Sequence, residues 1–121
     1  MGRARIADDV GEQGVRAALH AGASRNDTAT AVRFLLQLLA ERAPGNTVEV
    51  RVPPFGAVQA IEGPRHTRGT PPNVIEMDAP TWLALATGAE PWSAAVAAGR
   101  VAASGSRADL SEHLPILQMR Q

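Results

Sequence analysis

The chain of 121 residues contains no cysteine, no tyrosine and no lysine, and aromatic residues make up only 3% of it. Without cysteine, it forms no disulfide, no thiolate-ligated zinc site and no catalytic thiolate. With so few aromatic side chains, it has little from which to build stacking platforms for single-stranded nucleic acid. Twelve acidic residues balance twelve arginines, and a formal net charge of zero gives no electrostatic reason to expect a nucleic-acid partner or an anionic membrane surface.

Long hydrophobic runs are also missing. The most apolar stretch, residues 31–40, is interrupted by Arg33 and Gln37 and is too short to cross a bilayer. The first ten residues carry charges but no apolar segment typical of a signal peptide, so we expect no transmembrane segment and a cytoplasmic location. A hydrophobic fraction of 45% suffices for one small core, and the length predicts a single domain, residues 1–121, with residues 1–26 as an N-terminal extension within it.

Two helices are predicted in the first part of the chain. Three apolar residues at helical spacing indicate a short helix over residues 12–21. A longer helix is predicted to begin at Asp27 as its N-cap and to end at Pro44-Gly45. Its apolar positions over residues 32–39 form a face so wide that it needs cover on more than one side.

Four segments are predicted to be strands. Residues 48–52 alternate between valine and charged residues, which is typical of a half-buried strand, and the two prolines that follow indicate a bend. Further strands are predicted over residues 55–61, 74–77 and 100–104. The order of helix, strands, helices, strand and helix favours an α+β fold with a mostly antiparallel sheet.

Three further short helices are predicted from their end signals. Asp78 is placed to cap one of them, and Pro91 opens another that Gly99 stops. Ser106, with Asp109 three residues later, resembles a capping box for a last short helix.

The densest polar cluster lies within residues 63–72. Arg65, His66 and Arg68 fall within four residues there, and guanidinium groups match carboxylates and phosphates. Two interpretations stay open: a site for a small polar ligand, with His66 as acid or base in an enzyme, or a surface loop whose arginines pair with neighbouring acids.

The sequence contains no motif that indicates metal or cofactor chemistry. The histidines His20, His66 and His113 form no pair at metal-ligand spacing, and no nucleophile elbow, glycine-rich phosphate loop or paired carboxylates are present. We therefore expect no metal, no cofactor and no catalytic residue.

The apolar residues of the second half must meet those of the long helix. From the residues alone they form either an ordinary core or the wall of a binding space. The residues concerned are Phe34, Leu35, Leu38, Leu39, Trp82, Leu85, Trp92, Val96, Leu110, Leu114, Ile116 and Leu117.

Several of these segments resemble the type-2 sterol carrier protein family. Residues 73–88, with the sequence NVIEMDAPTWLALATG, and residues 91–105, with PWSAAVAAGRVAASG, match the family's order of strand, helix, helix and strand. The short apolar helix that follows in the family is matched by residues 109–114. Residues 51–59 and 65–73 are similar to its small actinobacterial branch, and the resemblance covers residues 27–117.

This resemblance implies a mixed sheet of about five strands, with helices mainly on one face, that encloses an apolar tunnel. It also implies that a small apolar ligand, such as a sterol, fatty acid or acyl chain, is bound without being transformed. The peroxisomal address of eukaryotic members is missing. The residues expected to contact the ligand are Phe34, Leu35, Leu39, Phe55, Trp82, Leu85, Trp92, Val96 and Leu114.

Two alternatives remain beside the carrier. The apolar face of residues 32–39 could pack on a partner or on a second copy, so a homodimer stays open. Alternatively, Arg65, His66 and Arg68 could serve a polar-ligand binder or an enzyme.

Overall fold

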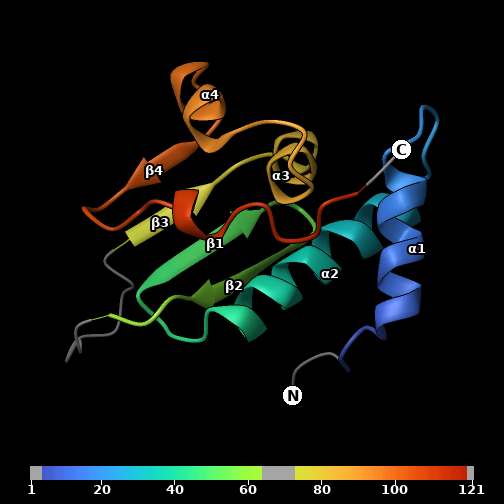
Figure 1. Ribbon diagram of the computed structural model, residues 1–121, viewed down its shortest axis with the longest axis horizontal. Helices are drawn as coiled ribbons and strands as arrows, with labels where there is room; N and C mark the ends of the chain where they lie inside the picture. The colour runs from blue at the N-terminus through green and yellow to red at the C-terminus, as the bar shows by residue number, and fades with distance from the viewer. Residues whose placement is uncertain (1–3, 64–72, 120–121) are drawn as a thin grey trace.

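The computed structural model describes residues 4–63 and 73–119 of the chain. In these residues helices and strands combine in an α+β fold, as predicted (Figure 1). The elements in chain order are α1 (Asp8–Ala18), α2 (Arg25–Arg42), β1 (Val48–Val52), β2 (Gly56–Ala60), β3 (Asn73–Glu76), α3 (Ala79–Ala86), α4 (Trp92–Ala97), β4 (Ala102–Ser104) and the 3₁₀ helix η1 (Ser111–His113).

The strands form one mixed sheet in the order β2-β1-β3-β4. β1 pairs antiparallel with β2 and parallel with β3, and β3 pairs antiparallel with β4. At the centre of the sheet, Val50 lies opposite Val58 on one side and Ile75 on the other. The mostly antiparallel character is confirmed, whereas the described residues hold four strands instead of about five.

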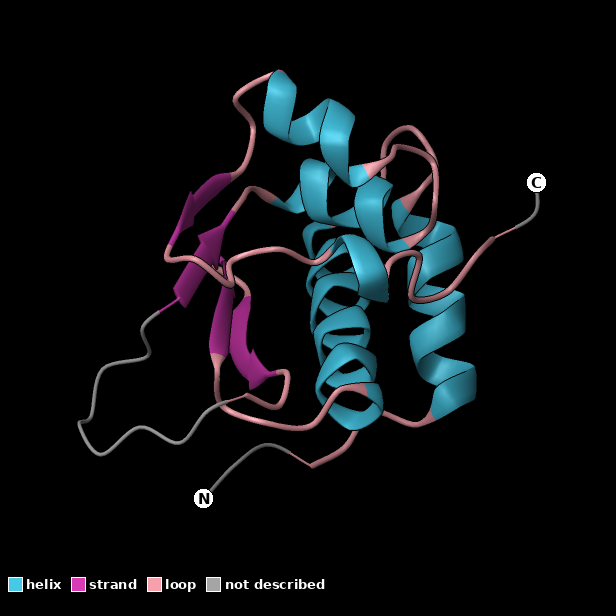
Figure 2. Cartoon of the chain, turned by 60° about the vertical axis from the view of Figure 1, so that its left-hand side comes forward, coloured by secondary structure: helices cyan, strands magenta, loops and turns pink. Residues whose placement is uncertain are grey.

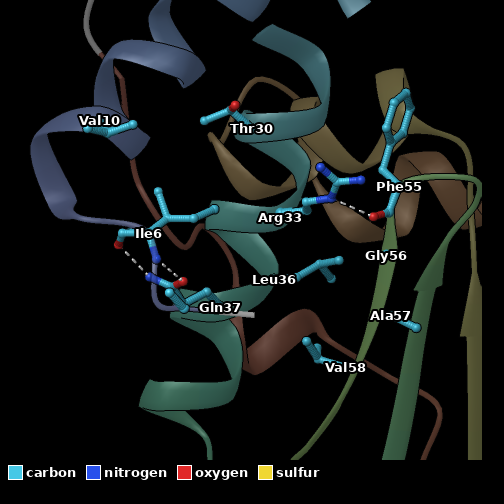
Figure 3. Close-up of a pocket in the computed structure, with 11 residues that line it drawn as sticks. Ile6, Val10, Thr30, Arg33, Leu36, Gln37, Phe55, Gly56, Ala57 and Val58 are labelled. Atoms are coloured by element: carbon cyan, nitrogen blue, oxygen red, sulfur yellow. Dashed lines mark hydrogen bonds between the residues drawn. The ribbon is translucent and has the colours of Figure 1, made fainter. Parts of the chain in front are cut away.

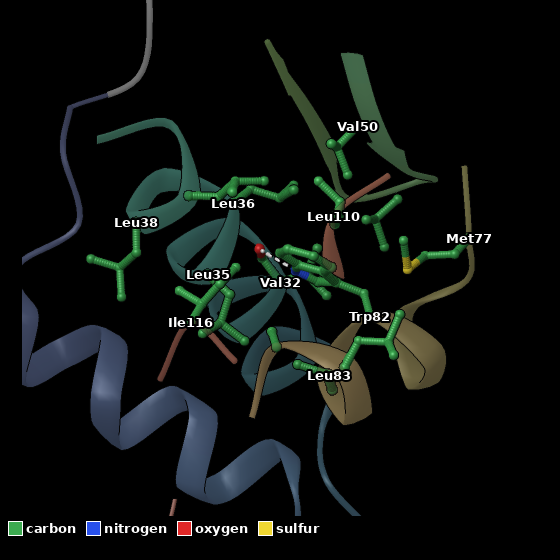
Figure 4. Packing of buried hydrophobic residues seen from close by; sticks show 14 of the residues in the cluster. Val32, Leu35, Leu36, Leu38, Val50, Met77, Trp82, Leu83, Leu110 and Ile116 are labelled. Atoms are coloured by element: carbon green, nitrogen blue, oxygen red, sulfur yellow. Dashed lines mark hydrogen bonds between the residues drawn. The ribbon is translucent and has the colours of Figure 1, made fainter. Parts of the chain in front are cut away.

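One face of the sheet carries the core. Val48, Val50 and Val52 are fully buried while Arg51 between them is exposed, so the alternation predicted for β1 is confirmed. Figure 2 shows the helices gathered beside the sheet. The core includes the fully buried side chain of Trp82 from α3, which packs among residues of α2 and the sheet (Figure 4).

α1 begins earlier than predicted, at Asp8 instead of residue 12. Asp8 and Asp9 lie in its first turn, where negative charge is favourable to the helix dipole. Gly11 and Gly14 are buried against α2: a Cβ atom on Gly11 would overlap the ring of Phe34, and one on Gly14 would lie 2.7 Å from Cγ2 of Thr30. The two glycines therefore let α1 pack close to α2.

The N-cap predicted for α2 was wrong. Ser24 caps the helix, because its Oγ accepts a hydrogen bond from the backbone N–H of Asp27 at 3.0 Å. Asp27 instead lies in the first turn and adds a favourable negative charge there. Because the cap lies three residues earlier than expected, the helix is about one turn longer than predicted.

The last predicted helix, with Ser106 and Asp109 as a capping box, does not form. The carboxylate of Asp109 accepts from the backbone N–H of Ser111 at 2.7 Å, and a single 3₁₀ turn follows. The backbone N–H of Arg107 is already bonded to Asn73 Oδ1 at 2.8 Å. This tertiary hydrogen bond ties the segment to the start of β3.

Asp78 caps α3 as predicted, and this cap should be pH-dependent. Its Oδ1 accepts from Thr81 N–H at 2.9 Å, and hydrogen bonds from the side chain and backbone of Thr81 lower the pKa of the Asp78 carboxyl. We expect Asp78→Ala to lower the free energy of unfolding by about 1 kcal/mol at neutral pH. A lowered pKa stabilises the fold above the unfolded value, about 3.9, so the difference from wild type should shrink as the pH falls through the folded pKa.

Urea denaturation at neutral and acidic pH measures this effect. Glu112→Ala removes an exposed acid from η1 and serves as the control, with little change expected at either pH. An Asp78→Ala deficit that stays constant on acidification would contradict a carboxylate cap.

Candidate functional site

A cavity of about 550 Å³ lies between the segment before α1, helix α2 and strand β2 (Figure 3). We name it the α2–β2 cavity. Its volume falls in the range of roughly 300–1,000 Å³ that is usual for small-molecule sites. Its lining residues are Ala4, Ile6, Val10, Thr30, Arg33, Leu36, Gln37, Phe55, Gly56, Ala57 and Val58.

The wall on the α1 side is fixed by Gln37 of α2. Its Oε1 accepts from the backbone N–H of Ile6 at 2.8 Å, and its Nε2 donates to Ile6 O at 2.9 Å. This reciprocal pair holds the backbone of Ile6 much as a neighbouring strand would. Arg5 also pairs with Glu41 at 2.6 Å and with Asp8 at 3.0 Å, and its hydrogen bond lowers the pKa of the Glu41 carboxyl. Because these groups are exposed, the ion pairs position the segment more than they stabilise it.

The opposite wall is the β1–β2 hairpin, and two arginines of α2 contact its Phe55. Nε of Arg33 donates to Phe55 O at 2.8 Å. The guanidinium carbon of Arg25 lies 5.2 Å from the centroid of the Phe55 ring, within the range of a cation–π interaction. Gly56 follows directly, and its lack of a side chain leaves the cavity open beside Leu36.

The lining determines which chemistry this cavity offers. Most of its side chains are apolar, and Arg33 is the one charged residue among those that the structure places on its wall. Across residues 4–63 and 73–119, no group of three or more histidines and acids is arranged to hold a metal ion. The cavity therefore offers mainly apolar contacts, one guanidinium group and the polar side chains of Thr30 and Gln37.

A second cavity of about 550 Å³ lies between α3, α4 and the segment around η1, and we name it the α3–α4 cavity. The segment that closes it is fixed by Ala86 O, which accepts from the backbone N–H of Ile116 at 2.8 Å and of Leu117 at 3.0 Å. Arg42 of α2 donates to Ile116 O. The cavity is lined by Leu85, Gly88, Glu90, Pro91, Trp92, Ser93, Ser111, Leu114 and Pro115.

The nine predicted apolar contacts are divided among four places. Phe55 lines the α2–β2 cavity, and Val96 is 43% exposed on α4. The three that line the α3–α4 cavity are Leu85, Trp92 and Leu114. Phe34, Leu35, Leu39 and Trp82 line neither cavity and belong to the core, each at most 1% exposed, and Leu85 is also fully buried there.

Two other parts of the chain were predicted as binding surfaces: the polar cluster within residues 63–72 and the apolar face of residues 32–39. Arg65, His66 and Arg68 lie outside the described residues. The apolar face of residues 32–39 is covered by the chain itself, with its apolar side chains at most 8% exposed. That face is therefore not free to pack on a second copy, because α1, α3 and the sheet already occupy it.

Sequence analysis missed most of the α2–β2 cavity. Ile6 precedes α1 and Val10 lies in its first turn, and Ile6 is placed beside α2 by its hydrogen bonds to Gln37, 31 residues away in sequence. One signal was present: Arg33 and Gln37 interrupt the most apolar stretch of the chain. Polar residues one turn apart within an apolar helix indicate a specific polar contact, and both residues line this cavity.

The family model described as bacterial SCP ortholog matches residues 24–116 of the chain. This range covers α2, the whole sheet, α3, α4 and η1. The chain therefore belongs to this bacterial family of sterol carrier protein orthologues, and the resemblance found in its sequence is confirmed. Membership indicates lipid binding in general. No curated protein matches the chain, and no helix in its described residues is long and apolar enough to cross a membrane.

Proposed function

We propose that this protein binds the apolar part of a lipid, without transforming it, in the α2–β2 cavity. The observation that carries the proposal is the place of this cavity, between the long helix α2 and the sheet, with a mostly apolar lining that includes Ile6, Leu36 and Val58. Val10 at its rim is 53% exposed, and a bound apolar chain would cover it.

The energetics set a minimum size for such a ligand. Burial contributes about 0.8 kcal/mol per methylene group, and association costs several kcal/mol. A micromolar dissociation constant, about −8 kcal/mol, then requires roughly fifteen buried methylene groups. This points to a long acyl chain or a similarly large ring system.

The α3–α4 cavity is the second candidate place for the same function. It is favoured by Trp92, a partly buried aromatic ring on its wall. Against it, its lining includes the carboxylate of Glu90, which pairs with Arg100 and would have to lie beside an apolar chain. The α2–β2 cavity has no acidic residue in its described lining, which favours it.

A cavity-filling substitution at Gly56 tests the proposal. A Cβ atom there would lie 3.5 Å from Leu36 Cδ1 and 3.7 Å from Arg33 Cγ, so an added side chain makes ordinary contacts and extends into the cavity. Gly56→Ile should weaken binding of a fluorescent acyl-chain probe by about tenfold or more, since displaced methylene groups lose their burial. The thermal midpoint should hold or rise, because isoleucine suits a strand better than glycine.

Two further variants complete this experiment. Ala102→Ile makes a comparable change on exposed β4 and should leave binding unchanged. Ser93→Phe obstructs the α3–α4 cavity. Loss of binding in Ser93→Phe but not in Gly56→Ile would move the site to the α3–α4 cavity, and a wild-type protein that binds no acyl probe would refute the proposed function.

A further inference from the structure

Arg33 lies on the wall of a mostly apolar cavity, and among the described residues it uses few of its donors. An arginine side chain has five N–H donors, and Nε uses one of them on Phe55 O. Among the described residues, the two terminal nitrogens make no hydrogen bond or ion pair. Figure 3 shows the bond from Nε to the Phe55 oxygen, with the terminal nitrogens left beside the cavity.

The bond to Phe55 also fixes the orientation of the guanidinium group. With Nε held at 2.8 Å from a main-chain oxygen, the plane of the group is set before any ligand binds. Preorganised donors lose less entropy on binding than free ones. Thr30, one turn earlier on α2, lines the same cavity, and its side chain carries a hydroxyl donor.

We propose that Arg33 is the residue that determines ligand specificity, by binding a carboxylate head group while the apolar chain fills the rest of the α2–β2 cavity. This inference rests on the proposed function. The terminal nitrogens of a guanidinium group form two parallel hydrogen bonds with a carboxylate. An apolar chain that covers the cavity removes water from Arg33, so the cation then needs an anion of the ligand to replace its hydration.

The charge balance favours a carboxylate over the other head groups. Arg33 is the one charged residue in the described lining, so a singly charged head group neutralises it. A sterol hydroxyl or an ester leaves the cation without a counter-charge. A phosphate monoester carries close to two negative charges at neutral pH, which exceeds what one guanidinium group provides.

The test compares ligands that differ only in their head group. Hexadecanoic acid, its methyl ester, hexadecanol and hexadecyl phosphate each displace one fluorescent acyl probe from the wild-type protein, at about pH 8, where the carboxyl group is ionised. We expect the acid to bind most tightly. Arg33→Met, which keeps an apolar stem, should weaken binding of the acid by about ten- to a hundredfold and change binding of the ester by less than about threefold.

Controls separate specificity from structure. Arg16→Met removes an exposed arginine of α1 and should leave the affinity for all four ligands unchanged. Arg33→Lys keeps the charge but loses the parallel N–H donors of the guanidinium group, so it should bind the acid more tightly than Arg33→Met and less tightly than wild type. Because Arg33→Met could disturb the Phe55 hairpin, the wild-type protein provides an independent measurement: added salt should weaken binding of the acid but not of the ester.

The outcomes distinguish the two proposals. Equal weakening of acid and ester by Arg33→Met, or equal salt dependence, would overturn this inference alone and assign Arg33 a purely structural role. Tighter binding of the phosphate or the alcohol than of the acid would overturn it in favour of that head group. If none of the four ligands displaces the probe, the proposed function fails and this inference fails with it.

Discussion

Replacing Trp82 with alanine is expected to lower the free energy of unfolding by about 3–5 kcal/mol, the range for truncating a large buried aromatic side chain. Trp82 is 0% exposed, and Figure 4 shows its ring among Val32, Leu110 and Met77. Its Nε1–H donates to Val32 O at 3.3 Å. Removing the indole leaves a void between α2, α3 and the sheet, and the surrounding elements can collapse into it only in part.

Urea denaturation followed by circular dichroism measures this loss. Trp92→Ala is the matched control, because Trp92 is only partly buried on the wall of the α3–α4 cavity, and we expect it to cost clearly less. The contrast also tests the role of Trp82, which was predicted to contact a ligand. Similar small losses for both variants would contradict its assignment to the core.

Changing Asn73 to aspartate is expected to have the next largest effect, a loss on the order of 3 kcal/mol at neutral pH. Asn73 is 3% exposed. Its Nδ2 donates to Thr47 O at 3.0 Å, and its Oδ1 accepts from Arg107 N–H at 2.8 Å. The side chain thus joins the start of β1 and β3 to the segment after β4. A carboxylate cannot donate to Thr47 O, and it buries a charge beside that oxygen.

The effect of Asn73→Asp should depend on pH. Protonation of the introduced carboxyl removes its charge and restores a donor, so the variant should approach wild-type stability as the solution is acidified. Asn46→Asp makes the same chemical change at an exposed position just before β1 and should cost little at any pH. If the two variants lose the same stability at neutral pH, Asn73 does not join these segments in the way described.

Local signals in the sequence determined most of the secondary structure. The periodicity of residues 32–39 reflects the burial of a helix on several sides, and the alternation of residues 48–52 reflects a strand with one buried face. Asp78 caps α3 because a cap depends on a side chain and a backbone donor only three residues apart. In each case the residues that carry the signal also make the contact.

Competition between neighbouring signals explains the errors near the ends of helices. Ser24 and Asp27 are both good N-caps, and the chain uses the first of them. Ser106 and Asp109 have the spacing of a capping box, but the carboxylate of Asp109 accepts from the backbone N–H of Ser111, and only a 3₁₀ turn forms. One cap is worth about 1 kcal/mol, so residues a few positions apart that can each act as a cap differ too little for the sequence to choose between them.

The sequence by itself determined the α+β class, the family and which residues are apolar enough to be buried. Only the tertiary structure decided what buries them: Phe34 packs on Gly11, Trp82 fills the core, and Phe55 lines a cavity. The cavity is assembled from contacts 22 and 31 residues apart, between Arg33 and Phe55 and between Gln37 and Ile6. Such contacts leave no local pattern, since apolar periodicity records that a side chain avoids water and not whether a neighbouring side chain or a ligand replaces that water.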